Sequence, residues 1–261
     1  MLKTRLIPVL YIKNWLIVRS ENFTIHQNIW NVINEAKRYN DWNIDELIYI
    51  DISRKKDYDL WRDDHKIKSY NNIEKIIQNI SKICFSPLAF WWWIRTLNDV
   101  DLLIKNWADK VVVNTWAFLN PDLITDIWKK YWKQAIILSV DYKVINWLPI
   151  VFTNFWSYNT NINIFDWISK YEKLWIWELF INSIDRDGKA NWYDIENIKK
   201  IYNYTKVPII ACWWVCDEYD FLDLAEEVNI SWLAAWNFFH FVENSYGRSK
   251  KILKKYNLNF R

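Results

Sequence analysis

The fold is decided by residues 87–116, whose sequence is PLAFWWWIRTLNDVDLLIKNWADKVVVNTW. An apolar run at 86–90 is followed by three tryptophans, a pattern of helical period at 97–105 and a second apolar run at 110–114. A β-type run, a helical segment and another β-type run are typical of one β–α–β unit of a parallel sheet. The same order recurs along the chain.

Eight such units predict a closed barrel. Candidate strands lie at 6–12, 46–52, 86–90, 110–114, 135–141, 178–182, 207–212 and 231–235. Helical patterns between them include 73–84, 97–105, 121–131, 164–174, 194–202 and 218–228. Eight β–α units in 261 residues favour a (β/α)8 TIM barrel over an open sheet. Because no Pro-, Gly- or Ser-rich linker divides the sequence, we expect a single domain over residues 1–261.

The sequence also contains an internal repeat of half a barrel. Residues 92–94 follow one strand and residues 114–116 end the next, and residues 213–215 and 234–236 repeat this arrangement half a chain later. We interpret each copy as a strand, a tight turn that opens a helix, and a second strand that ends in a turn of small residues.

Tryptophan outnumbers glycine in this chain by 21 to 2, where an average composition would give about 18 glycines. Many of the tryptophans stand in turn-like contexts such as Asn14-Trp15 and Asn146-Trp147, and residues 91–93 are three tryptophans after an apolar run. Glycine is the usual residue in such turns, because only glycine takes a positive φ cheaply.

Three interpretations of the tryptophans compete. Core tryptophans should follow a period of two or 3.6, whereas these gather at segment ends. Tight turns are poor sites for an aromatic binding surface, since a left-handed tryptophan costs about 1–2 kcal/mol. The third interpretation, which we favour, is that UGA codons read as glycine in the source have been translated as tryptophan. Trp167 fits a helical pattern and looks genuine, and Trp42 fits either interpretation.

Read as glycine, the repeated turns predict two phosphate-binding loops, centred on Trp92, Trp93, Trp213, Trp214 and Trp236. A glycine-rich turn at a helix N-terminus presents free N–H groups and a favourable dipole to a phosphate. Barrels carry such sites at the carboxyl ends of their strands. Two copies half a barrel apart predict a substrate with a phosphate at each end.

Four aspartates are expected at the same rim. Asp51 closes the second strand, Asp141 closes the fifth, and Asp185 and Asp187 follow the sixth. A carboxylate there can act as a general acid or base, although each one alone could equally cap a loop or form a salt bridge. Four on one face favour a catalytic site.

The remaining composition narrows the class of protein. A net charge of +3 is too small to indicate nucleic-acid binding, and the three histidines are scattered and offer no metal site. Cys84, Cys212 and Cys216 fit no disulfide framework and suit free thiols of a reducing cytoplasm. No apolar stretch reaches the roughly 18 residues of a membrane span, and the N-terminal run is too short for a signal peptide.

These motifs resemble the cyclase (HisF-type) subunit of imidazole glycerol phosphate synthase over essentially the whole chain. The matching segments are 5–8 (RLIP), 45–47 with Asp51, 91–95 (WWWIR for GGGIR), 108–111 with 114–115, 140–141, 183–188, 192–194 (WYD for GYD) and 239–241 (FHF). Tryptophan stands at the family's glycine in nearly every motif, which supports the UGA interpretation independently.

The resemblance implies a lyase of histidine biosynthesis, in a cytoplasmic heterodimer with a HisH-type glutaminase subunit. Ammonia from the glutaminase would enter the bottom of the barrel and close an imidazole ring on a bis-phosphorylated ribulosyl nucleotide. The products would be imidazole glycerol phosphate and an aminoimidazole nucleotide, and no cofactor or metal is implied. The substrate-binding positions carried over are Trp92, Trp93, Asn114, Thr115, Asp185, Asp187, Gly188, Trp213, Trp214, Ala235 and Trp236.

The family's general acid–base pair is two aspartates, of which one has a counterpart here. Asp141 matches the aspartate of the fifth strand, whereas Tyr11 stands at the position of the first-strand aspartate. A phenol with an ordinary pKa of about 10 cannot act as a carboxylate near neutral pH. The family's charged ammonia gate is matched one for one by Arg5, Glu46, Lys110 and Glu178.

Two further functions stay open. Segment 55–72 is longer than in ordinary members, and together with Tyr11 it resembles a paralogue branch associated with surface-polysaccharide genes. Such a protein would supply ammonia for sugar amidation. The other alternative is a non-catalytic scaffold that binds and activates a glutaminase. Tyr11 favours that scaffold, while Asp141 and the two expected phosphate loops favour chemistry.

Overall fold

The computed structural model describes residues 3–21, 25–53, 56, 58, 69–186, 193–241 and 243–256. Asp187, Gly188 and most of segment 55–72 lie outside these described residues. No helix among the described residues is long and apolar enough to cross a bilayer.

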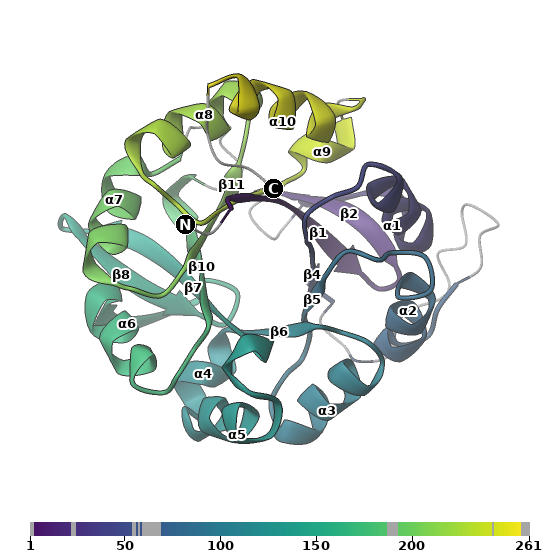
Figure 1. Cartoon of the computed structure of the whole chain (residues 1–261). Helices are drawn as coiled ribbons and strands as arrows, with labels where there is room; N and C mark the ends of the chain where they lie inside the picture. The colour runs from purple at the N-terminus through teal and green to yellow at the C-terminus, as the bar shows by residue number, and fades with distance from the viewer. Residues whose placement is uncertain are drawn as a thin grey trace.

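Eight parallel strands close into a barrel, which confirms the (β/α)8 prediction (Figure 1). The ring runs β1, β4, β5, β6, β7, β10, β11, β12 and closes where β12 pairs with β1. The barrel strands are β1 (Arg5–Lys13), β4 (Leu47–Asp51), β5 (Leu88–Trp91), β6 (Lys110–Val113), β7 (Ile136–Ile145), β10 (Glu178–Ser183), β11 (Ile209–Trp214) and β12 (Trp232–Trp236).

Helices surround the barrel and pack their apolar faces on it (Figure 1). They begin at clear caps: Asn31 caps α1 and Asn163 caps α6, and Thr96 and Asp217 open capping boxes. The helices are α1 (Val32–Asp41), α2 (Ile73–Ile80), α3 (Leu97–Lys105), α4 (Thr115–Leu119), α5 (Asp122–Tyr131), α6 (Ile164–Glu172), α7 (Ile195–Tyr204), α8 (Glu218–Glu227), α9 (Phe238–Phe241) and α10 (Ser245–Lys255), with 3-10 turns η1 (Lys133–Ala135) and η2 (Ile184–Arg186).

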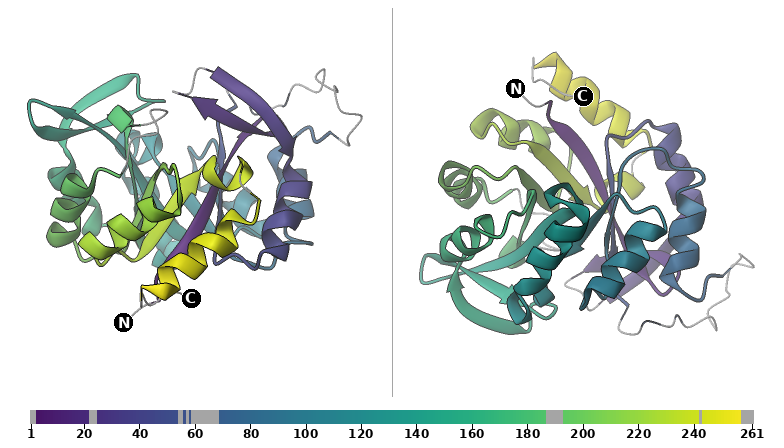
Figure 2. Two further views of the ribbon diagram at one scale, coloured as in Figure 1. Left: turned by 90° about the horizontal axis from the view of Figure 1, so that it is seen from above. Right: turned by 60° about the horizontal axis from the view of Figure 1, so that its bottom comes forward.

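Two antiparallel extensions rise above the rim at the carboxyl ends of the strands (Figure 2). β2 (Leu16–Glu21) and β3 (Ile25–Asn31) continue β1, and β8 (Leu148–Thr153) and β9 (Tyr158–Asn163) continue β7. These four strands were not predicted, because β3 and β9 read IHQNIWN and YNTNIN and lack alternating apolar residues. Their equivalent places after β1 and β7 make the half-barrel repeat visible.

The barrel encloses an apolar cluster of its own, here called the inner cluster. Its buried members alternate along the strands, as a period of two requires. They are Ile7, Val9, Tyr11, Val18, Ile48, Ile50, Ile52, Ala89, Val112, Ile137, Phe180, Ile210, Cys212, Trp232, Ala234 and Trp236. The alternate residues of the same strands face the helices.

The predicted helix starts at the tryptophan turns were wrong. Residues 92–94 open no helix, because α3 begins at Leu97 behind its cap Thr96. Likewise β11 extends through Trp214, and α8 begins at Glu218 behind Asp217. In both places a capping box three or four residues further on decides where the helix begins.

Among the described residues, five tryptophans adopt the left-handed backbone that favours glycine: Trp107, Trp132, Trp147, Trp156 and Trp175. Trp107 occupies the position just beyond α3 where its own N–H binds Ile104 O and the next N–H binds Leu103 O. This is the Schellman arrangement, in which glycine is usual. Trp132, with φ 66° and ψ 162°, lies in a region that is essentially restricted to glycine.

The turn between β7 and β8 is the clearest single case. Asn146 and Trp147 both have positive φ (48° and 68°) and join the strands as a two-residue hairpin. Asn-Gly is the preferred pair in such a turn, because both central residues need a left-handed backbone. Trp147 is 93% exposed, so its side chain gains almost no burial in return.

We predict that Trp147→Gly stabilises the chain. The left-handed backbone costs tryptophan about 1–2 kcal/mol, and the added freedom of glycine in the unfolded chain takes back about 0.5–1 kcal/mol. The free energy of unfolding, measured in urea, should therefore rise by about 1 kcal/mol.

The matched control is Trp167→Gly, because Trp167 is buried on α6. This change should cost about 3–5 kcal/mol through lost packing. A similar loss of stability in both variants would contradict the strain assigned to the turn.

Candidate active site

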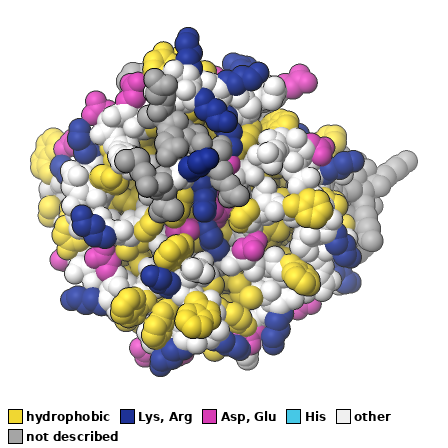
Figure 3. Space-filling model, viewed as in Figure 1, with side chains coloured by type: hydrophobic (Ala, Val, Ile, Leu, Met, Phe, Trp, Pro, Cys, Tyr) yellow, Lys and Arg dark blue, Asp and Glu magenta, His cyan; other side chains and the backbone are white. Residues whose placement is uncertain are grey.

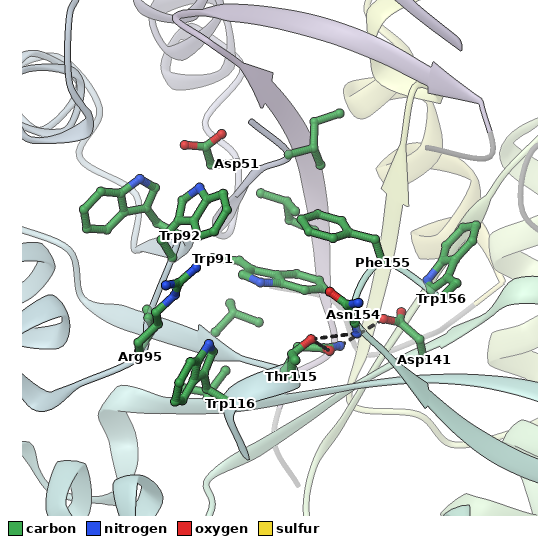
Figure 4. A pocket seen from close by; sticks show the side chains of 17 residues that line it. Asp51, Trp91, Trp92, Arg95, Thr115, Trp116, Asp141, Asn154, Phe155 and Trp156 are labelled. Atoms are coloured by element: carbon green, nitrogen blue, oxygen red, sulfur yellow. Dashed lines mark hydrogen bonds between the residues drawn. The ribbon is translucent and has the colours of Figure 1, made fainter. Parts of the chain in front are cut away.

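A cavity of about 130 Å³ opens at the carboxyl ends of β4, β5, β6 and β7, beside the loop after β8 (Figure 4). It takes up one half of the rim. Its lining residues are Ile50, Asp51, Ile52, Trp91, Trp92, Trp93, Ile94, Arg95, Val112, Val113, Asn114, Thr115, Trp116, Asp141, Asn154, Phe155 and Trp156. The described residues contain no cluster of His, Cys, Asp or Glu that could hold a metal ion.

Asp141 is held by side-chain amides from the strands on either side. Asn114 on one side donates its Nδ2–H to Oδ2 at 2.9 Å, and Asn182 on the other donates to Oδ1 at 3.0 Å. Burial raises the pKa of Asp141 to about 6, and these amides with the Trp156 indole hold it lower than burial alone would. The Asp141 carboxyl group is therefore fixed in direction, and its pKa lies close to neutral pH.

Asp51 is the second buried carboxylate of the cavity. Its Oδ1 accepts the Ser53 N–H at 2.8 Å, and its Oδ2 accepts the Tyr58 hydroxyl at 2.7 Å. Burial raises the pKa of Asp51 to about 7, while Ser53 and Tyr58 act to lower it. Tyr58 was not anticipated as a site residue, and only its place in the long segment after β4 could have suggested it.

Tyr11 lies inside the barrel mouth rather than among the cavity-lining residues. Its ring stacks on Trp236, with ring centroids 4.9 Å apart and an interplanar angle of 29°. The structure therefore does not bring the residues at the family's acid–base positions, Tyr11 and Asp141, together in one cavity.

The first expected phosphate loop lines the cavity, with Trp92, Trp93, Asn114 and Thr115 all at its wall. The Trp93 indole donates to Ser53 O at 3.0 Å, and the Thr115 hydroxyl accepts the N–H of Asn154 at 2.9 Å. The buried Trp92 indole N–H has no acceptor among the described residues.

The second expected loop is placed elsewhere, since Trp213, Trp214, Ala235 and Trp236 line no part of the cavity. The Trp213 ring turns outward against Tyr142 and Tyr193. The Trp214 ring packs against the inner cluster and carries the Arg19 guanidinium 5.0 Å from its centroid.

Of the aspartates expected after β10, Asp185 lies in η2 and accepts the Val144 N–H at 2.8 Å. This hydrogen bond connects β7 to the turn η2 that follows β10. Asp187 and Gly188 lie outside the described residues, so their expected role stays a prediction. Asn182 was not predicted as a site residue. It lies next to last in β10, and Asn114 directly follows β6, so both amides stand at the carboxyl end of a strand beside β7. That shared position is the signal that could have identified Asn182.

The four gate residues meet at the amino ends of the strands. Lys110 Nζ lies 2.7 Å from Glu46 and 2.6 Å from Glu178, and Arg5 binds Glu46 at 2.9 Å. The Trp232 ring lies inside the barrel next to them, with Arg5 and Lys110 5.2 and 5.8 Å from its centroid. Lys and Arg side chains lie at the centre of this face of the molecule (Figure 3).

Burial and the neighbouring Glu46 carboxylate raise the pKa of Glu178 to about 7, and Lys110 keeps it from rising higher. Burying these four charged side chains costs desolvation energy, and the ion pairs among them compensate for that cost.

A closed βα barrel with a paired charge cluster at the amino end and two buried carboxylates at the carboxyl end has the architecture of a barrel enzyme. The model of the family described as "Histidine biosynthesis protein" matches residues 5–242. This chain belongs to that family.

Two curated relatives are each named "Imidazole glycerol phosphate synthase subunit HisF". The protein of Sulfurisphaera tokodaii is 33% identical over 207 residues, which cover 79% of each chain. The protein of Staphylococcus aureus (strain bovine RF122 / ET3-1) is 29% identical over 257 residues, 98% of each chain.

The raised carboxylate pKa values predict that stability falls as pH rises. Asp51, Asp141 and Glu178 have folded-state pKa values of about 7, 6 and 7, above their ordinary values. The folded state therefore binds more protons than the unfolded state between about pH 4 and pH 7. The stabilisation is complete below about pH 4 and is lost as pH rises through 7.

Urea unfolding between pH 4.5 and 8 measures this slope, and Glu178→Gln should flatten it. A free energy of unfolding that rises with pH over this range would contradict the assignment.

Proposed function

We propose that this chain is a HisF-type cyclase subunit. It uses ammonia from a HisH-type glutaminase to close an imidazole ring on a bis-phosphorylated ribulosyl nucleotide, forming imidazole glycerol phosphate and an aminoimidazole nucleotide. The family and the names of the relatives support this class of reaction. The observation that carries the proposal is Asp141, a buried carboxylate directed by two amides at a cavity on the catalytic rim.

The chemistry needs a group that both takes and gives protons. Asp141, with a pKa raised to about 6 by burial, is present in both protonation states near neutral pH. Attack of ammonia on a ketone carbon forms a C–N bond, and the carbonyl oxygen leaves as water after it has been protonated. A carboxyl group at the cavity wall can take the proton from nitrogen and deliver one to oxygen.

The charge cluster at the other end suits an entrance for ammonia. Lys110, Glu46 and Glu178 are buried together around the start of the barrel axis, and pairing compensates their charges. A neutral molecule would need only a small displacement of these side chains to pass. This face is also where the glutaminase subunit would dock.

We also propose that most of the tryptophans are glycines in the natural protein. Among the described residues five have a positive φ, which is costly for tryptophan and not for glycine. Buried indole N–H groups without an acceptor among the described residues add a further cost at Trp15, Trp92, Trp213, Trp232 and Trp236, but Trp167 shares this property, so the positive φ carries the argument. A cavity of about 130 Å³ is also small beside the roughly 300–1,000 Å³ of ligand pockets.

Tyr11 is the observation that favours a second function. If its phenol cannot replace the missing carboxylate, the chain would either supply ammonia for sugar amidation, as in the paralogue branch, or only activate a glutaminase. In both alternatives the chain would still have the charged gate and a glutaminase partner, but it would form no imidazole product.

The first test measures imidazole product from ammonia and the bis-phosphorylated nucleotide. The reference is the more active of two forms: the chain as printed, and a glycine form with glycine at every tryptophan except Trp42 and Trp167. We expect Asp141→Asn to lower kcat by about 10²–10⁴-fold, because general acid–base catalysis is worth that much. Lack of any product, with glutaminase activation retained, would refute the cyclase proposal.

Tyr11→Asp separates the alternatives further. If the family's chemistry depends on a carboxylate at this position, the variant should turn over faster than the reference while its unfolding midpoint stays similar. An unchanged or lower rate in a folded variant would mean that the missing aspartate is not what limits turnover.

A further inference from the structure

The cavity is bounded by two carboxylates on opposite sides (Figure 4). Asp51 comes from the end of β4 and Asp141 from β7, and β5 and β6 separate these strands in the ring. They are the only acidic side chains among the described lining residues. A substrate that enters this cavity would therefore lie between two carboxyl groups.

Neither carboxylate is neutralised by a cation among the described residues. The ionisable or hydrogen-bonding groups that act on Asp51 are Ser53 and Tyr58, whereas amides and an indole act on Asp141. Arg95 also lines the cavity, but its guanidinium lies over the Trp93 and Trp116 rings, at 4.9 and 5.8 Å. Buried carboxylates without a counter-ion are rare as purely structural elements, because their desolvation is not compensated.

Asp51 is also fixed in direction. The Ser53 N–H binds one carboxylate oxygen and the Tyr58 hydroxyl binds the other. Ser53 is held in turn by Asn14, whose N–H donates to the Ser53 hydroxyl at 2.7 Å, and by Trp93. The backbone N–H of Tyr58 donates to Asn71 O, which joins Tyr58 to the residues just before α2.

We propose that Asp51 is the acid–base partner of Asp141 across the cavity, and that Tyr58 is a positioning residue that holds the Asp51 carboxylate in place. The proposal rests on the proposed cyclase function and deepens it. It gives this chain a pair of carboxyl groups without an aspartate at position 11.

The pair balances the proton transfers of ammonia addition. One carboxylate takes a proton from the attacking nitrogen, and the opposite carboxyl group gives a proton to the carbonyl oxygen, which leaves a carbinolamine. A second proton then passes from nitrogen to the group that gave the first one, while the other group gives its proton to the hydroxyl, so that water leaves, an imine forms and both groups return to their starting states. Two groups on opposite faces of the reacting carbon do this without a large movement of the substrate.

A structural role for Asp51 gives different expectations. If the carboxylate only caps the Ser53 turn, its loss would lower stability and leave the pH dependence of turnover unchanged. If it transfers protons, Tyr58 matters for rate through the protonation state of Asp51. The hydroxyl donates to the charged form and lowers the pKa of Asp51, so its removal should raise that pKa.

The experiment compares Asp51→Asn and Tyr58→Phe with the reference form in the ammonia-dependent reaction from pH 5.5 to 9. We expect Asp51→Asn to lower kcat by about 10²–10⁴-fold with little change in KM. Tyr58→Phe should keep most of the rate but move one limb of the pH profile of kcat to higher pH. Asp101→Asn, on the outer surface beside Lys130, is the matched control and should change neither value.

The outcomes separate the two proposals. Product from the reference together with an active Asp51→Asn variant would overturn the role of Asp51 alone. A Tyr58→Phe profile identical to the reference would do the same if Asp51→Asn proved unable to fold, as judged by its unfolding transition. Failure of every form to make product would instead overturn the cyclase function, and this proposal with it.

Discussion

The interior of an eight-stranded barrel has room for little more than its own side chains, and this limit governs the rest of the molecule. β12 places Trp232 and Trp236 inside the barrel, near its two ends, and Tyr11 stacks on the second. Among the described residues, a cavity of about 130 Å³ opens on the side of β4 to β7. The side chains carried by a few inward positions therefore decide whether a large substrate can enter.

The same closed ring explains why charge gathers at both ends. Every barrel strand runs in one direction, so Glu46, Lys110 and Glu178 meet where strands begin, and Asp51 and Asp141 lie where strands end. At the first end the opposite charges are paired. At the second end, Asp51 and Asp141 have no counter-ion among the described residues and are directed by hydrogen bonds.

The sequence predicted the barrel and its strands within a few residues, because period and strand order depend on local pattern. The four gate residues came from the family resemblance, and the structure brings them together at the amino ends of the strands. The sequence did not predict the β2–β3 and β8–β9 extensions, since the second strand of each, β3 and β9, is polar and lacks a strand period. It placed Asp51 and Asp141 at the ends of their strands, where both line the cavity. It did not anticipate Asn182 or Tyr58, because their hydrogen bonds to these carboxylates depend on the three-dimensional fold. It placed the helix starts at the tryptophan turns, where capping boxes further along override them.

We propose that the tryptophans mark glycine positions of an ammonia-using barrel. A peptide mass spectrum of the protein from its natural source decides this, over the peptides that span residues 91–93 and 146–147. We expect glycine at 91, 92, 93 and 147. Tryptophan at these four positions would refute the proposal.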